Sequence, residues 1–317
     1  MAWAGLGLFL FSGCSFMEIH LAPEIQPLEE KVVRGDSGPK VLLVDIRGMI
    51  SNRKRTSLMG HPLELGMVEQ VREIIKKAEK DEKIQALLLR INSPGGTVTS
   101  SDIIFHELEE FKKRRKIKIY ALMMDVAASG GYYIALAADR IIAHPTSITG
   151  SIGVITIKVN LAGLMDKVGV DWEVVKSGEK KDFLSPFRAL TPEERRLFQE
   201  TIDSFHNRFL EHIARHRPGL ENLQEVRALA DGRVFTSDQA LRLKLIDHIG
   251  YMDETEALIK KDLGVEAVQL VAYHRPGDYK SNWYSRMDSG TSFQLIRLDA
   301  NFLPENPGPH FLYMWMP

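Results

Sequence analysis

Short apolar runs alternate with segments of helical spacing in the chain after residue 40. Continuous apolar runs predict strands buried on both faces, and apolar residues that recur every three or four positions predict amphipathic helices. The predicted strands are 41–46, 84–91, 117–124 and 140–143. The predicted helices are 65–80, 102–113 and 130–138. This alternation indicates an α/β fold with mainly parallel strands.

The second half of the chain opens with a strong helix signal. Thr191 is the expected N-cap, Pro192 occupies the first helical position, and Glu194 completes a capping box. We expect this helix to continue to about His216, because a Pro-Gly pair follows soon afterwards. Shorter helices are predicted near 222–229, 236–243 and 253–262, and a strand at 265–273.

The first residues have the pattern of an export signal. Residues 2–11 form an apolar run that is too short to cross a bilayer of about 30 Å as a helix, but has the length of a secretory signal. Small residues precede Cys14, as in the lipid-attachment sites of bacterial lipoproteins, although Phe11 replaces the usual leucine and no basic residue comes first. We expect a lipoprotein-type signal peptide over 1–14 with Cys14 lipidated. The alternatives are an uncleaved signal anchor and a chance cysteine in a cleaved peptide.

Two further segments flank the predicted core. Residues 15–39 are polar and rich in proline and glycine, which predicts a tether. The tail from 275 onward ends in an apolar stretch that could dock on its own domain, on a neighbouring subunit or on a membrane. One hypothesis places it in a neighbour's groove. The expected organisation is a signal peptide over 1–14, a tether over 15–39, a main domain over 40–262, and a C-terminal strand and tail over 263–317.

Composition narrows the classes of function. The 317 residues carry a formal net charge of −1, so a nucleic-acid partner gains no electrostatic support. There is one cysteine, Cys14, and therefore no intrachain disulfide.

Three segments that carry candidate chemistry each follow a predicted strand. The first, 91–96, ends in Gly95 and Gly96, whose N–H groups could face a bound oxygen as an oxyanion hole requires; a tight Pro-Gly turn is the alternative. The second, 125–133, places Ser129 between a strand and a helix, where it is either a nucleophile or a plain N-cap. In the first case Gly130 would supply a second oxyanion donor.

The third segment, 176–182, offers a base for a serine hydroxyl. A neutral lysine can take the hydroxyl proton, but a free lysine has a pKa near 10.4, so such a lysine must lie in a dry place. A solvated surface turn is the alternative explanation of this lysine-rich segment. The residues alone do not choose between Lys180 and Lys181.

Taken together, these segments resemble the signal peptide peptidase A (protease IV) family in its short, single-unit form. The resemblance covers roughly 40–262. The matching stretches are 91–96, 125–133, 149–154, 177–182 with Ser185, Pro186 and Arg188, 231–235, 239–240, 245–247 and 249–250. Several motifs in the family's order make the resemblance specific.

The resemblance implies a Ser-Lys dyad on a crotonase-like, Clp-protease-like fold. The family's nucleophile falls on Ser129, its lysine on Lys181, and its oxyanion donors on Gly95, Gly96 and Gly130. No metal or organic cofactor is required. Short family members form ring-like homo-oligomers, with an octamer expected, in which serine and lysine meet across a subunit interface. Their substrates are remnant signal peptides and other unfolded membrane-associated peptides, cut by an exported domain in the bacterial cell envelope. Such substrates imply an apolar groove, and Tyr132 is either beside this groove or a packing residue.

Four rival hypotheses remain open. A Ser-His-Asp protease would need His144 or His106 beside Ser129. His212 and His216 are four apart on a helix, but lack the glutamate of a zinc-protease motif. The non-enzymatic hypothesis is a membrane-tethered scaffold that forms rings and binds peptides without cutting them. A crotonase-type acyl-CoA enzyme shares the fold class, but the export signal and the Ser-Lys pair argue against it.

Overall fold

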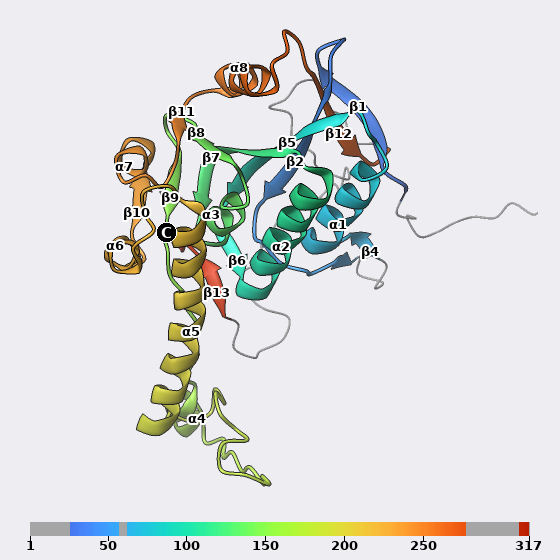
Figure 1. The fold of residues 1–317 in the computed structure, drawn as a ribbon. Helices are drawn as coiled ribbons and strands as arrows, with labels where there is room; N and C mark the ends of the chain where they lie inside the picture. Colours follow the sequence, from blue (N-terminus) through green and yellow to red (C-terminus); the bar gives the residue numbers. More distant parts are fainter. Residues whose placement is uncertain (1–25, 57–61, 277–310, 317) are drawn as a thin grey trace, which may run out of the picture.

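A mostly parallel sheet forms the centre of the computed structural model, which describes residues 26–56, 62–276 and 311–316 (Figure 1). Its spatial order is β1 (Glu29–Arg34), β12 (Gln269–His274), β2 (Lys40–Arg47), β5 (Ile84–Ser93), β7 (Lys118–Ala128), β8 (Arg140–Ala143) and β11 (His248–Ile249). A branch from the end of β7 adds β9 (Ile148–Gly150) and β10 (Val234–Thr236). Only the β1–β12 and β9–β10 pairs of this sheet are antiparallel. The predicted α/β class with mainly parallel strands is confirmed.

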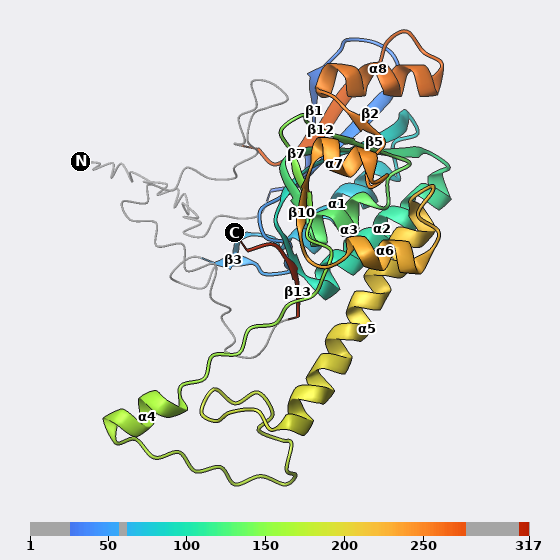
Figure 2. The ribbon, with the colours of Figure 1, turned by 90° about the vertical axis from the view of Figure 1, so that its left-hand side faces the viewer.

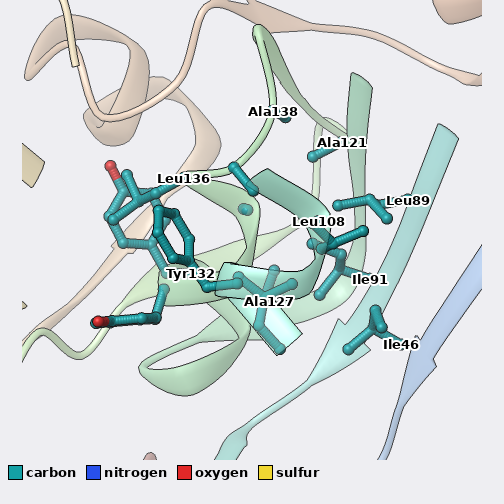
Figure 3. Packing of buried hydrophobic residues seen from close by; sticks show 14 of the residues in the cluster. Ile46, Leu89, Ile91, Leu108, Ala121, Ala127, Tyr132, Leu136 and Ala138 are labelled. Atoms are coloured by element: carbon teal, nitrogen blue, oxygen red, sulfur yellow. The ribbon is translucent and has the colours of Figure 1, made fainter. Parts of the chain in front are cut away.

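Helices cover both faces of the sheet. One face carries α1 (Met67–Ala78), α2 (Val98–Arg115) and α3 (Gly130–Ala135), and the other carries α8 (Met252–Leu263) (Figure 1). Side chains of β2 alternate between the two cores: Leu42 and Val44 join the larger one, and Val41 and Leu43 join the one under α8. Figure 3 shows the larger core where Ile91 of β5, Ala127 of β7 and Tyr132 of α3 pack. The strand end and helix start on either side of Ser129 are therefore anchored in buried structure.

The expected tether over 15–39 is wrong for part of its length. Residues 29–34 form β1, which pairs along β12 at the edge of the sheet. Lys40 links β1 to the turn before β5, because its ammonium contacts the carboxylates of both Glu30 and Asp81 at 2.7 Å. The strand was missed because its pattern is polar: it is an edge strand, and no side chain in it is fully buried. Cys14 lies outside the described residues.

A long helix carries an arm away from the sheet. The helix is α5 (Pro192–His216), and the arm is residues 155–190, which include α4 (Ala162–Val168) (Figure 2). The predicted capping box at the start of α5 is confirmed by reciprocal bonds between Thr191 and Glu194. Of the remaining helices, α6 (Leu223–Leu229) packs against α5, and α7 (Ser237–Arg242) packs against the branch of the sheet (Figure 1). Across the described part of the chain, no helix is long and apolar enough to cross a membrane.

The apolar end of the chain docks on its own domain. Its strand β13 (Leu312–Met314) pairs antiparallel with β6 (Gly95–Thr97), which directly follows β5. This was one of the three docking places expected for the tail. A small hairpin of β3 (Arg55–Thr56) and β4 (Pro62–Glu64) completes the strands of the described residues.

Candidate active site

Ser129 occupies a strained backbone position between β7 and α3. Its φ of 53° and ψ of −115° are rarely adopted by a residue with a side chain. The side chain is only 1% exposed, and its Oγ has no hydrogen-bond partner among the described residues. Ser129 precedes the helix but makes no side-chain cap bond. The plain N-cap interpretation therefore does not explain this serine.

The three glycines predicted as oxyanion donors lie against one another. A Cβ added to Gly95 would lie 2.8 Å from the Gly130 nitrogen, and one added to Gly130 would lie 3.2 Å from the Gly96 nitrogen. Gly96 also lies against the neighbouring segment, where an added Cβ would be 1.9 Å from the carbonyl oxygen of Ile50. Side chains are thus excluded at these positions on steric grounds. The N–H of Gly95 already donates to Ser93 Oγ at 3.1 Å, so among these three glycines the Gly95 N–H is engaged within the turn.

The three lysines of the lysine-rich turn differ in their ion-pair partners. Lys176 pairs with Asp182, and Lys180 pairs with Glu193, each at 2.7 Å. The Glu193 carboxylate holds the pKa of Lys180 above its ordinary value, which disfavours the neutral form that a base requires. Within the described residues, the ammonium of Lys181 has no such partner. This contrast separates Lys181 from Lys180, which the residue pattern alone did not.

Ser129 and Lys181 do not meet within one chain. The lysine turn is fixed at the start of α5 by Glu193, whereas Tyr133, four residues after Ser129, packs on Phe209 with ring centroids 5.0 Å apart. The helical rise between positions 193 and 209 amounts to about 24 Å. The lysine turn at the start of α5 therefore lies far from α3, which directly follows Ser129, in a single copy of the chain; Figure 2 shows α3 and the arm at opposite ends of α5.

Arg188 ties the lysine turn to the start of α5. Its guanidinium bonds to both carboxylate oxygens of Asp182 at 2.8 and 2.9 Å, and to both of Glu194 at 2.8 and 2.6 Å. These bonds lower the pKa of Glu194 to about 2 and hold the pKa of Asp182 well below its usual range. One charged side chain thus orients the turn that carries Lys181.

The candidate histidines have other surroundings. His144 contacts Thr146 and the ring of Tyr251, and His106 is exposed on α2. Neither bonds to Ser129, so the structure gives no support to a histidine base. His212 and His216 pack against the ring of Phe105, and burial lowers the pKa of His212 to about 4.

An aromatic pocket lies next to Ser129, and the ring of Tyr313 fills it. The sequence drew attention to Tyr132, but that ring is fully buried and donates its hydroxyl to the Leu245 carbonyl at 2.8 Å. The next residue, Tyr133, lines the pocket together with Phe209, and both contact the ring of Tyr313. The signal that could have located the pocket is the unusually apolar end of the chain, which occupies it.

Comparison with known proteins decides the family. The model of peptidase family S49 matches residues 111–266, and the Clp protease model matches residues 42–149. A protein of Enterococcus faecium assigned as a signal peptide peptidase SppA is 34% identical over 294 residues, which are 90% of this chain and 84% of that one. The chain belongs to peptidase family S49. The Clp protease match agrees with the parallel sheet, and confirms the Clp-like fold.

Longer S49 relatives match over part of their length. Protease 4 of Haemophilus influenzae is 35% identical over 217 residues, which are 68% of this chain and 34% of that protein. The chloroplastic serine protease SPPA of Arabidopsis thaliana is 35% identical over 215 residues, which are 66% of this chain and 31% of that protein. The chain thus spans about a third of these two relatives. As a member of S49, it is a serine peptidase.

Proposed function

We propose that this S49 peptidase is a membrane-anchored serine endopeptidase with Ser129 as nucleophile and Lys181 as general base. The Ser129 hydroxyl carries the proposal: it is buried, lacks a hydrogen-bond partner among the described residues, and sits on strained backbone. Backbone strain and an unpaired buried hydroxyl both cost stability, and both are typical of reactive groups.

The surrounding groups support acyl transfer. Ser129 Oγ attacks the carbonyl carbon of a peptide bond while Lys181 takes its proton. The N–H groups of Gly96 and Gly130 stabilise the negative charge on the carbonyl oxygen, while Gly95, whose N–H donates to Ser93 Oγ, shapes the turn. Lys181 then gives the proton to the leaving amine, and water hydrolyses the acyl-enzyme. No metal or organic cofactor enters these steps.

Lys181 would reach the serine of a second copy of the chain. Two observations support this arrangement: the long distance between the groups in one copy, and the apolar surface of the arm. Half of the large apolar side chains that are exposed among the described residues lie between 157 and 175. Burying such a patch against another subunit would stabilise an assembly. It would also exclude water from Lys181, which favours the neutral form of its amine. A ring-like homo-oligomer, with an octamer as the expected size, fits this head-to-tail contact.

The proposed substrates are remnant signal peptides and other unfolded membrane-associated peptides. The Enterococcus relative's assignment as a signal peptide peptidase supports this substrate class. Lipidation of Cys14 would hold the exported catalytic domain at the membrane of a bacterial cell envelope, close to such peptides.

The test is cleavage of a quenched fluorescent peptide by the full chain in detergent. We expect Ser129→Ala and Lys181→Ala each to lower the rate by at least about 10³-fold. Lys180→Ala is the matched control and keeps most of the rate. An active Lys181→Ala enzyme would show that the base is wrong. A wild type that cuts none of several peptides would favour an inert, ring-forming peptide-binding scaffold.

A further inference from the structure

Basic side chains gather where α1 and α2 end. Residues 76–83 and 112–118, which we call the basic end, carry ten basic and three acidic side chains. The two stretches touch, because Arg115 donates to the carbonyls of Ala78 and Asp81 at 2.7 and 3.0 Å. The whole chain has a net charge of −1, so this excess of positive charge is local.

Local structure accounts for part of this charge. Basic residues in the last turn of a helix interact favourably with the helix dipole, and three of those in the basic end also form ion pairs. These pairs are Lys112 with Glu109, Lys113 with Glu110, and Arg114 with Glu79. Four further lysines are exposed and form no ion pair with a described residue: Lys76, Lys80, Lys83 and Lys116. These four leave a positive surface that faces the solvent.

One of the four lysines occupies a backbone position that favours a different residue. Lys116 ends α2 in the left-handed conformation, with a φ of 52°. Glycine is the usual residue at such a position, because a Cβ is strained there. Lys244, the other lysine in this conformation among the described residues, bonds through its ammonium to the Gly219 carbonyl, whereas Lys116 forms no such bond. Local stability therefore does not explain Lys116, but a role for its charge does.

The chain enters the fold beside the basic end. Lys77, in the last turn of α1, donates to the carbonyl of Leu28, and β1 begins at the next residue. Fourteen positions separate Leu28 from Cys14, so a fully extended chain between them spans at most about 50 Å. A lipid attached to Cys14 would therefore keep this side of the molecule close to the membrane.

The basic end and Ser129 lie at opposite ends of the sheet. Lys83 directly precedes β5 and Lys118 begins β7, whereas Ser129 follows the last residue of β7. The eleven residues of β7 extend over about 36 Å. In Figure 1, α1 ends beside β1, on the side of the molecule away from β13. A surface that binds the basic end thus leaves the active site open on the far side.

We propose that the basic end binds the anionic surface of a phospholipid membrane and holds the active site away from the bilayer. This inference rests on the membrane anchor of the proposed function. Lipid phosphates complement the exposed lysines, and each basic side chain close to an anionic surface strengthens binding about fivefold. The anchor alone leaves the domain free to rotate, and these contacts give it one orientation. Substrates then reach Ser129 only after they leave the bilayer.

The test is acetylation of the lysines of the full chain on vesicles, measured residue by residue with mass spectrometry. Acetylation needs the neutral amine, and an anionic surface favours the ammonium form. We compare vesicles of phosphatidylcholine with vesicles that contain an equal part of phosphatidylglycerol. Lys83 should react about fivefold more slowly on the anionic vesicles. High salt should remove the difference, because it screens the charges. Lys167, which is exposed on the arm, should react equally on both.

Matched variants separate binding by the basic end from general attraction of positive charge. The slow reaction of Lys83 should be lost when three other lysines of the basic end are changed together: Lys76→Gln, Lys80→Gln and Lys116→Gln. The control removes the same charge from exposed positions elsewhere: Lys167→Gln, Arg242→Gln and Lys244→Gln. In this control Lys83 should still react slowly on anionic vesicles.

Equal reaction of Lys83 on the two kinds of vesicle overturns the proposal, and so does an equal loss of the slow reaction in both triple variants. Cleavage of the fluorescent peptide in detergent, measured on the same samples, should be unchanged in both and shows that they are folded. A chain that cuts the peptide but shows no slow reaction keeps its proposed catalytic function and loses only this surface. A chain that sediments with neither kind of vesicle overturns both the anchor and the surface.

Discussion

At the scale of single residues, Ser129 combines three properties that a structural serine avoids. It is buried, its hydroxyl is unpaired within the described residues, and its φ is 53°. Backbone in such a region costs on the order of 1–3 kcal/mol. The surrounding sheet and helix supply the stability that holds it there, because Ala127 and Tyr132 on either side are fully buried in the larger core.

This strain predicts a difference between two inactive variants. Glycine adopts positive φ without a Cβ clash, although it loses more entropy on folding than alanine does. We expect Ser129→Gly to have a free energy of unfolding about 1 kcal/mol higher than Ser129→Ala. Urea unfolding followed by circular dichroism measures the difference. A Ser129→Gly protein that is less stable than Ser129→Ala would show that the position is not strained.

Residue-level chemistry could be predicted from the sequence only in part. The glycine pair and Ser129 each had an ordinary structural explanation. The residue pattern alone did not separate Lys180 from Lys181; the family resemblance favoured Lys181, and the Glu193 partner of Lys180 supports the same choice. Tyr132 was singled out, but its neighbour Tyr133 lines the pocket. Choosing between Tyr132 and Tyr133 requires knowing which face of α3 is turned toward the pocket, and a helix of six residues is too short for its apolar pattern to show this.

At the scale of elements, Arg188 decides where the lysine turn lies. The turn has little regular structure. Besides the Lys180–Glu193 pair, it is linked to α5 by Arg188, which joins the carboxylates of Asp182 and Glu194. Glu194 also belongs to the capping box of α5, so the turn and the helix start share one polar cluster.

From this polar cluster we predict that part of the free energy of unfolding is lost at acidic pH. The folded-state pKa of Glu194 is lowered to about 2, chiefly by Arg188, from an ordinary value of 4.5. A lowered carboxylate pKa stabilises the fold above its ordinary value, and this stability is lost as the pH falls from about 4.5 to 2. We expect Glu194→Gln to be less stable than wild type at pH 7 by about 2 kcal/mol, and the gap to close toward pH 2.

Urea unfolding between pH 7 and pH 2 measures this gap. Glu200→Gln is the control on the same helix, because Glu200 forms an exposed pair with Arg196 and should follow wild type closely. A constant gap between wild type and Glu194→Gln across this range would contradict the assignment of the shift to the folded state.

Elements with a long apolar pattern were predicted well, and short ones were not. The strands at β2, β5, β7 and β8 were anticipated because each is a continuous apolar run that is buried on both faces. The helix α5 was anticipated from the capping signal at its start. β6 and β13 have three residues each and could not be seen this way. They are held by long-range backbone pairing, which leaves no periodic trace in a local stretch of sequence.

At the scale of the whole molecule, the arm separates the two proposed catalytic groups by most of the length of α5. Its exposed apolar side chains, such as Val175 at 96% exposure, have no counterpart in the described part of this chain that covers them. An assembly in which each copy lends its arm to the next would account for both features.

Mixing two inactive variants tests this arrangement. In a head-to-tail ring, an assembly of Ser129→Ala and Lys181→Ala chains regains a site wherever an intact serine meets an intact lysine from the neighbour. Random mixing should restore about a quarter of the wild-type rate. Co-expression followed by the fluorescent-peptide assay measures it, with the double variant as the inactive control. No recovery from mixed assemblies of normal size would place serine and lysine in the same copy.

The reach of the arm also has a consequence for the timing of proteolysis. If each chain takes its base from a neighbour, as proposed, a newly made chain is a latent enzyme until it meets its neighbours. Activity then depends on concentration: below the dissociation constant for assembly, chains accumulate without cutting, and above it the assembled chains cut. No inhibitor or separate activating enzyme is needed for this delay, because the same contact that builds the assembly completes its chemistry.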